Sequence, residues 1–147
     1  MAVTALLILA LAGALSISCV GPASAYDGKR LGDCPSSPNC TCSEMAPGDA
    51  AYIEPWTVPH EGDPGAAFEA LAALVSGRAA LQVREPLYLH AVFKTRWLRF
   101  RDDFEARLDP EAGLIHVRSA SRLGYSDLGA NRARVNKLRA AWADSLQ

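Results

Sequence analysis

The sequence predicts an α+β domain in which an antiparallel sheet of about four strands packs against an N-terminal and a C-terminal helix. Two segments carry apolar residues at helical spacing, and the segment between them carries apolar residues at every second position. A Pro- and Gly-containing turn divides two of the expected strands, which favours antiparallel pairing. The chain has 147 residues, enough for one domain of this kind.

Residues 1–25 have the features of an export signal. No charged residue precedes Asp27, and the apolar segment 5–15 has the length of the hydrophobic region of a signal peptide. Small residues at 23–25 predict cleavage after Ala25. The first four residues carry no Lys or Arg, so two alternatives stay open: a retained membrane anchor, or a lipid on Cys19. We therefore expect a periplasmic or extracellular protein, with the thylakoid lumen or a membrane-anchored form as alternatives.

Residues 26–63 predict a loop arm before the folded domain of residues 64–147. The arm is rich in Pro, Gly, Ser and Asp, which favour turns over regular structure. A structureless loop of this length is unusual in a small domain. We expect a disulfide and the apolar residues Tyr52, Ile53 and Trp56 to fasten the arm to the rest of the molecule.

Three cysteines lie in the arm: Cys34, Cys40 and Cys42. In an oxidising compartment the default prediction is a Cys34–Cys40 disulfide. Pairing of Cys34 with Cys42 stays open. Zinc bound by the thiolates with His60 or His90 is an alternative, but the C-x5-C-x-C spacing is not a standard zinc pattern. We expect neither a metal nor another cofactor.

The first helix is predicted over residues 64–76. Asp63 can accept hydrogen bonds from the free N–H groups at the start, and Pro64 suits the first helical position. Gly77 is a plausible end point. One face gathers the apolar residues Phe68, Leu71, Leu74 and Val75.

Four strands are predicted next, at 81–84, 87–94, 97–108 and 114–121. Residues 109–113 form the hairpin turn between the last two. The apolar pattern selects one register for this hairpin, because a slip by one residue would place Phe104 opposite Arg118. The selected register pairs Leu108 with Ile115, Ala106 with Val117, Phe104 with Ser119, Glu105 with Arg118 and Arg107 with His116.

The chain ends in a predicted helix at about 130–145. Its apolar stripe consists of Val135, Leu138, Trp142 and Leu146. The basic residues of this segment lie mostly off the stripe, which indicates a solvated face rather than a membrane-binding one.

Three segments together carry a family resemblance: 34–40 (CPSSPNC), 100–105 (FRDDFE) and 118–135 (RSASRLGYSDLGANRARV). The chain resembles the domain-of-unknown-function 1499 family over nearly all of residues 26–147. The resemblance implies an exported or membrane-associated domain without an established activity, and it supplies no catalytic residue. This chain departs from the family at Thr41-Cys42, where Val-Ser is more usual.

The segment from the last strand into the final helix is unusually polar, and a second acidic motif lies on the neighbouring strand. A network of salt bridges and helix caps would explain this, with Asp103 and Glu105 bound to Arg118 or Arg122, and Asp102 bound to Arg122 or Arg132. The same groups could instead bind an anionic small molecule or a lipid headgroup, with help from the N-terminus of the helix. The candidate binding residues are Asp102, Asp103, Glu105, Arg118, Ser119, Ser121, Arg122, Asp127, Asn131 and Arg132.

Composition and motifs narrow the function classes. The chain has 15 Lys and Arg against 16 Asp and Glu, which does not fit a nucleic-acid-binding protein. Asp102 and Asp103 are adjacent, so on a strand they point to opposite faces and make a poor catalytic pair. We expect a non-enzymatic binding or assembly module. The alternatives are a hydrolase that uses the acidic and arginine motifs, and a structural accessory with a membrane-protein partner.

Overall fold

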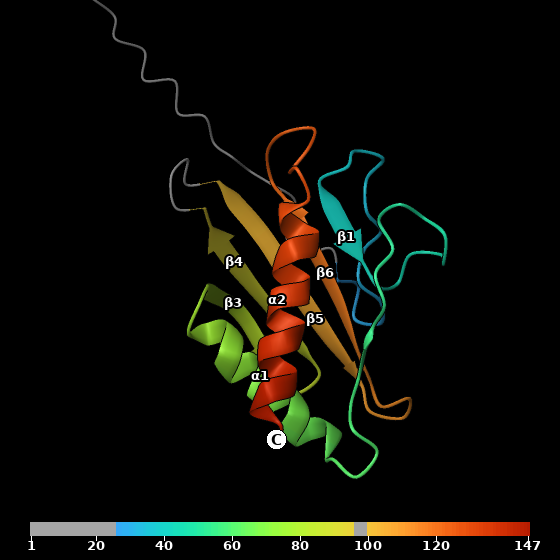
Figure 1. Cartoon of the computed structure of the whole chain (residues 1–147), viewed down its shortest axis with the longest axis vertical. Coiled ribbons are helices and arrows are strands. Elements are labelled where there is room, and N and C mark those ends of the chain that lie inside the picture. Colours follow the sequence, from blue (N-terminus) through green and yellow to red (C-terminus); the bar gives the residue numbers. More distant parts are fainter. Residues whose placement is uncertain (1–25, 96–99) are drawn as a thin grey trace, which may run out of the picture.

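Six antiparallel strands form one sheet, and two helices lie together on one of its faces (Figure 1). The computed structural model describes residues 26–95 and 100–147. The strand order is β1-β6-β5-β4-β3, and β2 also pairs with β6. The elements are β1 (Cys40–Cys42), β2 (Trp56–Thr57), α1 (Pro64–Ser76), β3 (Ala80–Glu85), β4 (Tyr88–Lys94), β5 (Arg101–Asp109), β6 (Leu114–Ser121) and α2 (Ala130–Ser145).

The predicted fold class is confirmed, but the strand count was too low. Both helices and the four central strands are present, and the Oδ1 atom of Asp63 accepts a hydrogen bond from the Gly65 amide at 2.9 Å, as expected of a cap. The additional strands β1 and β2 come from the arm. They span only three and two residues, too few for alternation of apolar residues to be visible in the sequence. The predicted start of the third strand, Trp97, lies outside the described residues.

The register predicted for the last hairpin is confirmed at every pair. Leu108 lies opposite Ile115, and Glu105 lies opposite Arg118. The apolar members of these pairs face the helices, so a one-residue slip would turn charged groups into the core. This register fixes which polar side chains of β5 and β6 share a face.

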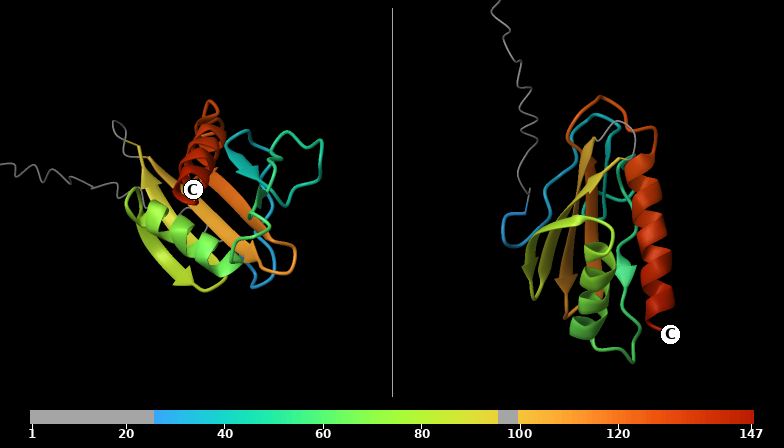
Figure 2. Two further views of the ribbon diagram at one scale, coloured as in Figure 1. Left: turned by 60° about the horizontal axis from the view of Figure 1, so that its bottom comes forward. Right: turned by 90° about the vertical axis from the view of Figure 1, so that its left-hand side faces the viewer.

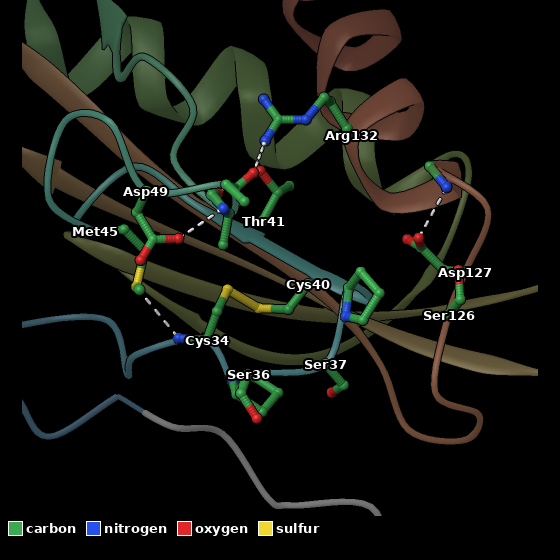
Figure 3. A pocket seen from close by; sticks show the side chains of 15 residues that line it. Cys34, Ser36, Ser37, Cys40, Thr41, Met45, Asp49, Ser126, Asp127 and Arg132 are labelled. Carbon is green, nitrogen blue, oxygen red and sulfur yellow. Dashed lines mark hydrogen bonds between the residues drawn. A yellow bond between two sulfur atoms is a disulfide. The ribbon is translucent and has the colours of Figure 1, made fainter.

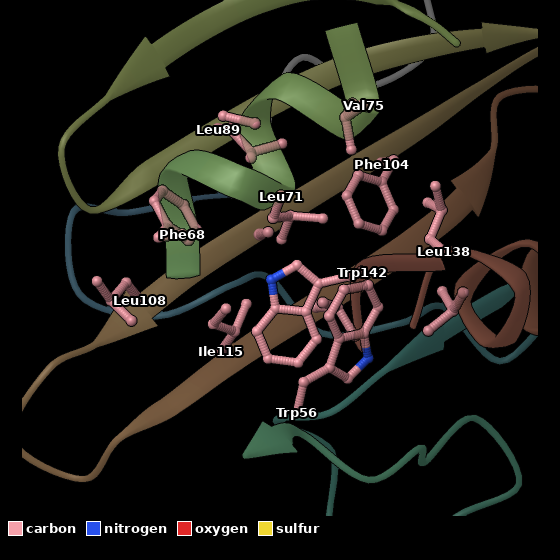
Figure 4. Close-up of a cluster of buried hydrophobic side chains, with 14 of the residues drawn as sticks. Trp56, Phe68, Leu71, Val75, Leu89, Phe104, Leu108, Ile115, Leu138 and Trp142 are labelled. Atoms are coloured by element: carbon pink, nitrogen blue, oxygen red, sulfur yellow. The ribbon is translucent and has the colours of Figure 1, made fainter. Parts of the chain in front are cut away.

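The apolar core lies between the sheet and the two helices (Figure 4). Trp56 of β2 packs against Trp142 of α2, with ring centroids 5.4 Å apart. The Trp142 Nε1 atom donates a hydrogen bond to the Ala67 carbonyl of α1 at 2.8 Å, which ties the two helices together. Ile53 and Trp56 are buried, as predicted, and Tyr52 is half-buried, so these residues anchor the arm.

The arm also covers the face of the sheet that the helices leave open. Figure 2 shows the first described residues crossing this second face, opposite the helices. There Leu31, Cys42 and Tyr88 form a small apolar cluster, and the Tyr26 ring stacks on the Tyr88 ring at 4.0 Å. Polar side chains of β4, β5 and β6 that point away from the helices are therefore buried as well.

Candidate functional site

The ten residues proposed from sequence are distributed over both faces of the sheet and the loop beyond it. Asp102, Ser119 and Ser121 share the helix-facing side with Phe104, because Phe104 lies opposite Ser119. Asp103, Glu105 and Arg118 point to the face covered by the arm. The remaining four follow β6: Arg122, Asp127, Asn131 and Arg132.

On the helix-facing side, a polar cluster joins β5 and β6 to α2. Asp102 is 2% exposed and accepts a hydrogen bond at 2.5 Å from Arg134. Its partner was therefore predicted wrongly as Arg122 or Arg132. The same Arg134 donates to Ser119 Oγ at 3.0 Å and to Asn131 Oδ1 at 2.6 Å. Arg134 lies one helical turn beyond Asn131 on α2. It reaches Asp102 because α2 packs against the sheet, and this packing is not visible in the sequence.

Asp127 holds the N-terminus of α2. Its carboxylate accepts hydrogen bonds from the amides of Gly129 and Asn131 at 2.9 and 2.8 Å. Burial acts to raise the pKa of Asp127, but these bonds and one from the Asn131 side chain outweigh it and lower the pKa. Gly129 has a φ of 81°, a conformation that favours glycine, and this turn aims the carboxylate at the helix start.

On the arm-covered side, Asp103 is held by Arg122 and His90. The Arg122 guanidinium donates two hydrogen bonds to its carboxylate, at 2.7 and 2.8 Å, and His90 Nε2 lies 2.7 Å from Oδ1. Burial acts to raise the pKa of Asp103, but the bonds from Arg122 and His90 outweigh it and lower the pKa to about 2. Asp103 is therefore a structural anion at neutral pH.

Glu105 is fully buried beside Asp103. It accepts hydrogen bonds from Arg118 at 2.9 Å and from the Tyr88 hydroxyl at 2.7 Å. Glu44 of the arm adds a third bonded acid, which accepts from Arg107 at 2.5 Å. These side chains form a network of ion pairs and hydrogen bonds across β4, β5 and β6. Each carboxylate in it accepts a hydrogen bond from at least one donor.

The cysteines of the arm form the predicted Cys34–Cys40 disulfide, and Cys42 stays a free, buried thiol. Burial raises the pKa of Cys42. The disulfide uses two of the three thiols that the alternative zinc site would have needed. No cluster of three or more metal-binding side chains occurs within residues 26–95 and 100–147.

A pocket of about 660 Å³ opens beside the disulfide (Figure 3). Three segments build it: the loop closed by the disulfide, the segment 45–51, and the turn that begins α2. Asp127 and Arg132, two of the predicted site residues, line it. The other predicted residues lie outside its lining.

The two carboxylates and the arginine of this pocket differ in their hydrogen-bond partners. Asp49 and Asp127 both accept hydrogen bonds from backbone amides of their own turns. Arg132 donates one bond, from Nη2 to the Ala50 carbonyl at 2.8 Å, and makes no ion pair within the described ranges. The pocket therefore offers a cationic donor whose charge is not balanced by a bonded carboxylate. The rest of the wall includes Pro35, Pro38 and the disulfide.

Several participants were not predicted from sequence: Arg134, His90, Glu44 and Tyr88 in the paired clusters, and Thr41 and Asp49 in the pocket. His90 of β4 could have been found, because it lies directly opposite Glu105 of β5 and is therefore two register positions from Asp103, on the same face of the sheet. Apart from the cysteines, no sequence pattern predicted the pocket, because most of its lining residues lie in loops.

Residues 30–142 match the family model described as "Protein of unknown function (DUF1499)". Neither a curated protein nor a solved structure matches the chain. In the described part of the chain, no helix combines the length and apolar character needed to cross a membrane.

Proposed function

The chain belongs to the DUF1499 family, and from its site geometry we propose that it is an exported, non-enzymatic binding module whose ligand site is the pocket beside the disulfide. The observation that carries this proposal is the position of Arg132 in the wall of that pocket. A guanidinium with spare donors and no paired carboxylate recognises an acceptor-rich or anionic group. The ligand class we propose is a small anionic molecule with an apolar part that contacts Pro35 and Pro38.

The location of the possible catalytic groups supports a binding role over a hydrolytic one. Ser119 is fully buried and donates its hydroxyl hydrogen to Asn131 at 2.6 Å. His90 is engaged with Asp103, and both lie under the arm. A nucleophile and a base need to reach a substrate in a pocket, and these groups line none of the pocket.

The paired clusters support a scaffold role for most of the predicted arginines. Arg118 and Arg122 each bind a buried carboxylate, so their charges are already compensated within the fold. Arg132 differs from both, because it bonds to a backbone carbonyl and not to a carboxylate. It is therefore the residue to substitute in a test of ligand binding.

Native mass spectrometry of the protein exported by its own host tests the proposal. We expect additional mass that disappears on denaturation, and we expect Arg132→Gln to lose that mass while remaining folded. Arg84→Gln is the matched control, because Arg84 is exposed on β3 at the opposite edge of the sheet. Equal retention of the mass in both variants, or no bound mass in the wild-type protein, contradicts the proposed site.

A further inference from the structure

One end of the molecule presents apolar side chains to solvent. Among the large apolar residues at this end that the structure describes, Leu128 is 96% exposed, Tyr125 76%, and Leu123 and Phe100 each 43%. One more exposed residue, Leu87 at 46%, lies elsewhere, just before β4. We call the four residues at this end the apolar tip. Three belong to the loop between β6 and α2, at the top of Figure 1, and Phe100 precedes β5. The two segments are neighbours, because the Arg122 amide donates to the Arg101 carbonyl at 3.1 Å.

The loop that carries the tip is fastened at several points. Asn39 of the disulfide loop donates from Nδ2 to the Gly124 carbonyl at 2.6 Å. The amide of Leu128 donates to Ser126 Oγ at 3.2 Å, and Asp127 binds the start of α2. These bonds hold the loop in one shape, so the exposure of its apolar residues is a property of the fold.

Leu128 is held in an unfavourable backbone conformation. Its φ is 53°, the left-handed region, and it is the one non-glycine residue with positive φ in the described part of the chain. This region costs a residue with a side chain about 1–2 kcal/mol. Asparagine or glycine would fit better there, so neither folding nor solubility explains a leucine that contacts almost nothing.

Two exposed cations lie next to the tip. Lys94 and Arg101 face each other directly across β4 and β5, and both are exposed. No carboxylate within residues 26–95 and 100–147 lies within ion-pair distance of either one. Like charges directly opposite each other destabilise a sheet. An anionic partner outside the chain would relieve this repulsion.

Protruding apolar side chains beside uncompensated cations match the chemistry of an anionic lipid surface. The core of a protein–protein interface is depleted of charged residues, whereas two exposed cations adjoin the tip, and its Leu128 is almost fully exposed. From this combination we propose that the tip docks the domain on an anionic bilayer: Leu128, Tyr125, Leu123 and Phe100 enter the interface, and Lys94 and Arg101 bind lipid phosphates.

A fluorophore at the tip tests the proposal. We would label Leu128→Cys with the environment-sensitive dye NBD in the full chain that also carries Cys19→Ser, which removes the thiol of residues 1–25. Glu111→Cys in the same background is the matched control. Glu111 is exposed in the β5–β6 turn, and Cys42 is too deeply buried to compete for the dye. Vesicles of phosphatidylcholine with phosphatidylglycerol should shift the emission to the blue at residue 128 and leave residue 111 unchanged. This comparison holds whether residues 1–25 are cleaved or retained, because the dye reports where each residue lies.

The charge requirement is tested in the same labelled chain. Each basic residue near an anionic surface is worth about 1 kcal/mol, so Lys94→Gln with Arg101→Gln should weaken the vesicle response about thirtyfold. Pure phosphatidylcholine vesicles should give a much smaller shift. No shift at residue 128, an equal shift at residue 111, or an equal shift in both lipids would overturn the proposal.

Discussion

Replacing Arg122 by glutamine removes two charge-assisted hydrogen bonds from a carboxylate that has almost no contact with water. The side chain of Asp103 is 5% exposed, and Arg122 reaches both of its oxygens. After the change, His90 is the remaining side chain bonded to Asp103. The variant therefore tests whether the ion pairs on the arm-covered face stabilise the fold.

The size of the effect follows from the pKa of Asp103. Lowering it from 3.8 to about 2 corresponds to about 2 kcal/mol of preference for the charged form. Breaking a buried ion pair on one side costs about 3–5 kcal/mol. Because Arg122 is partly exposed and His90 remains, we expect Arg122→Gln to lower the free energy of unfolding by about 2 kcal/mol.

Urea unfolding at neutral pH measures this loss without adding salt. The comparison needs the wild type, Arg122→Gln, Asp103→Asn and the double variant, because the pair interacts only if the losses are not additive. In the Asp103→Asn background, Arg122→Gln should cost much less. An equal loss in both backgrounds, or a loss below about 0.5 kcal/mol, would refute the reasoning.

The same pair predicts a pH dependence. A carboxylate whose pKa is lowered by folding adds stability above its unfolded pKa and loses it as the pH falls through its folded pKa. Wild-type stability should therefore decline between pH 3.8 and about 2 as Asp103 becomes protonated. Arg122→Gln should flatten this part of the curve, which urea midpoints at several pH values would show.

Three further predictions use other parts of the fold. Ellman's reagent should detect no thiol in residues 26–147 of the folded protein and one, Cys42, after denaturation without reductant, since Cys42 is buried and the other two cysteines are paired; detection of three would contradict the disulfide. Leu71→Ala empties a fully buried position under α1 and should cost about 2–5 kcal/mol in urea unfolding, with no change in slope; a smaller loss would mean that the core closes over the gap. Leu128→Asn should raise stability by about 1 kcal/mol, because asparagine tolerates positive φ; an unchanged thermal midpoint would show that the leucine is not strained.

Local signals predicted the helices and the central hairpin. Asp63 and Pro64 mark the start of α1, and alternation along β5 and β6 allows one register without charge in the core. Both kinds of signal act over a few residues, so the sequence displays them directly. The strands β1 and β2 escape such reasoning, because their pairing with β6 depends on where the arm docks.

Some pairs of the polar clusters followed from the sequence, whereas the pocket did not: of the ten candidate binding residues, Asp127 and Arg132 line it. Glu105 and Arg118 were paired correctly, because the hairpin register places them opposite each other. The partner of Asp102 was missed, since Arg134 reaches it only through the way α2 packs on the sheet. Burial on the second face was also missed, because it arises from coverage by the arm.

The pairing of the arm with β6 also imposes an order on folding. Cys40 lies opposite Ala120, so synthesis completes the arm well before its partner strand exists. Contacts between such distant segments form slowly, and until they form the backbone groups along this edge of β6 stay open to pairing with another copy of the chain. Cys34 and Cys40 are six residues apart and need no help from β6, so their bond can close first. We infer that the oxidised loop reaches β6 already bent, which shortens the interval in which the sheet is exposed to aggregation.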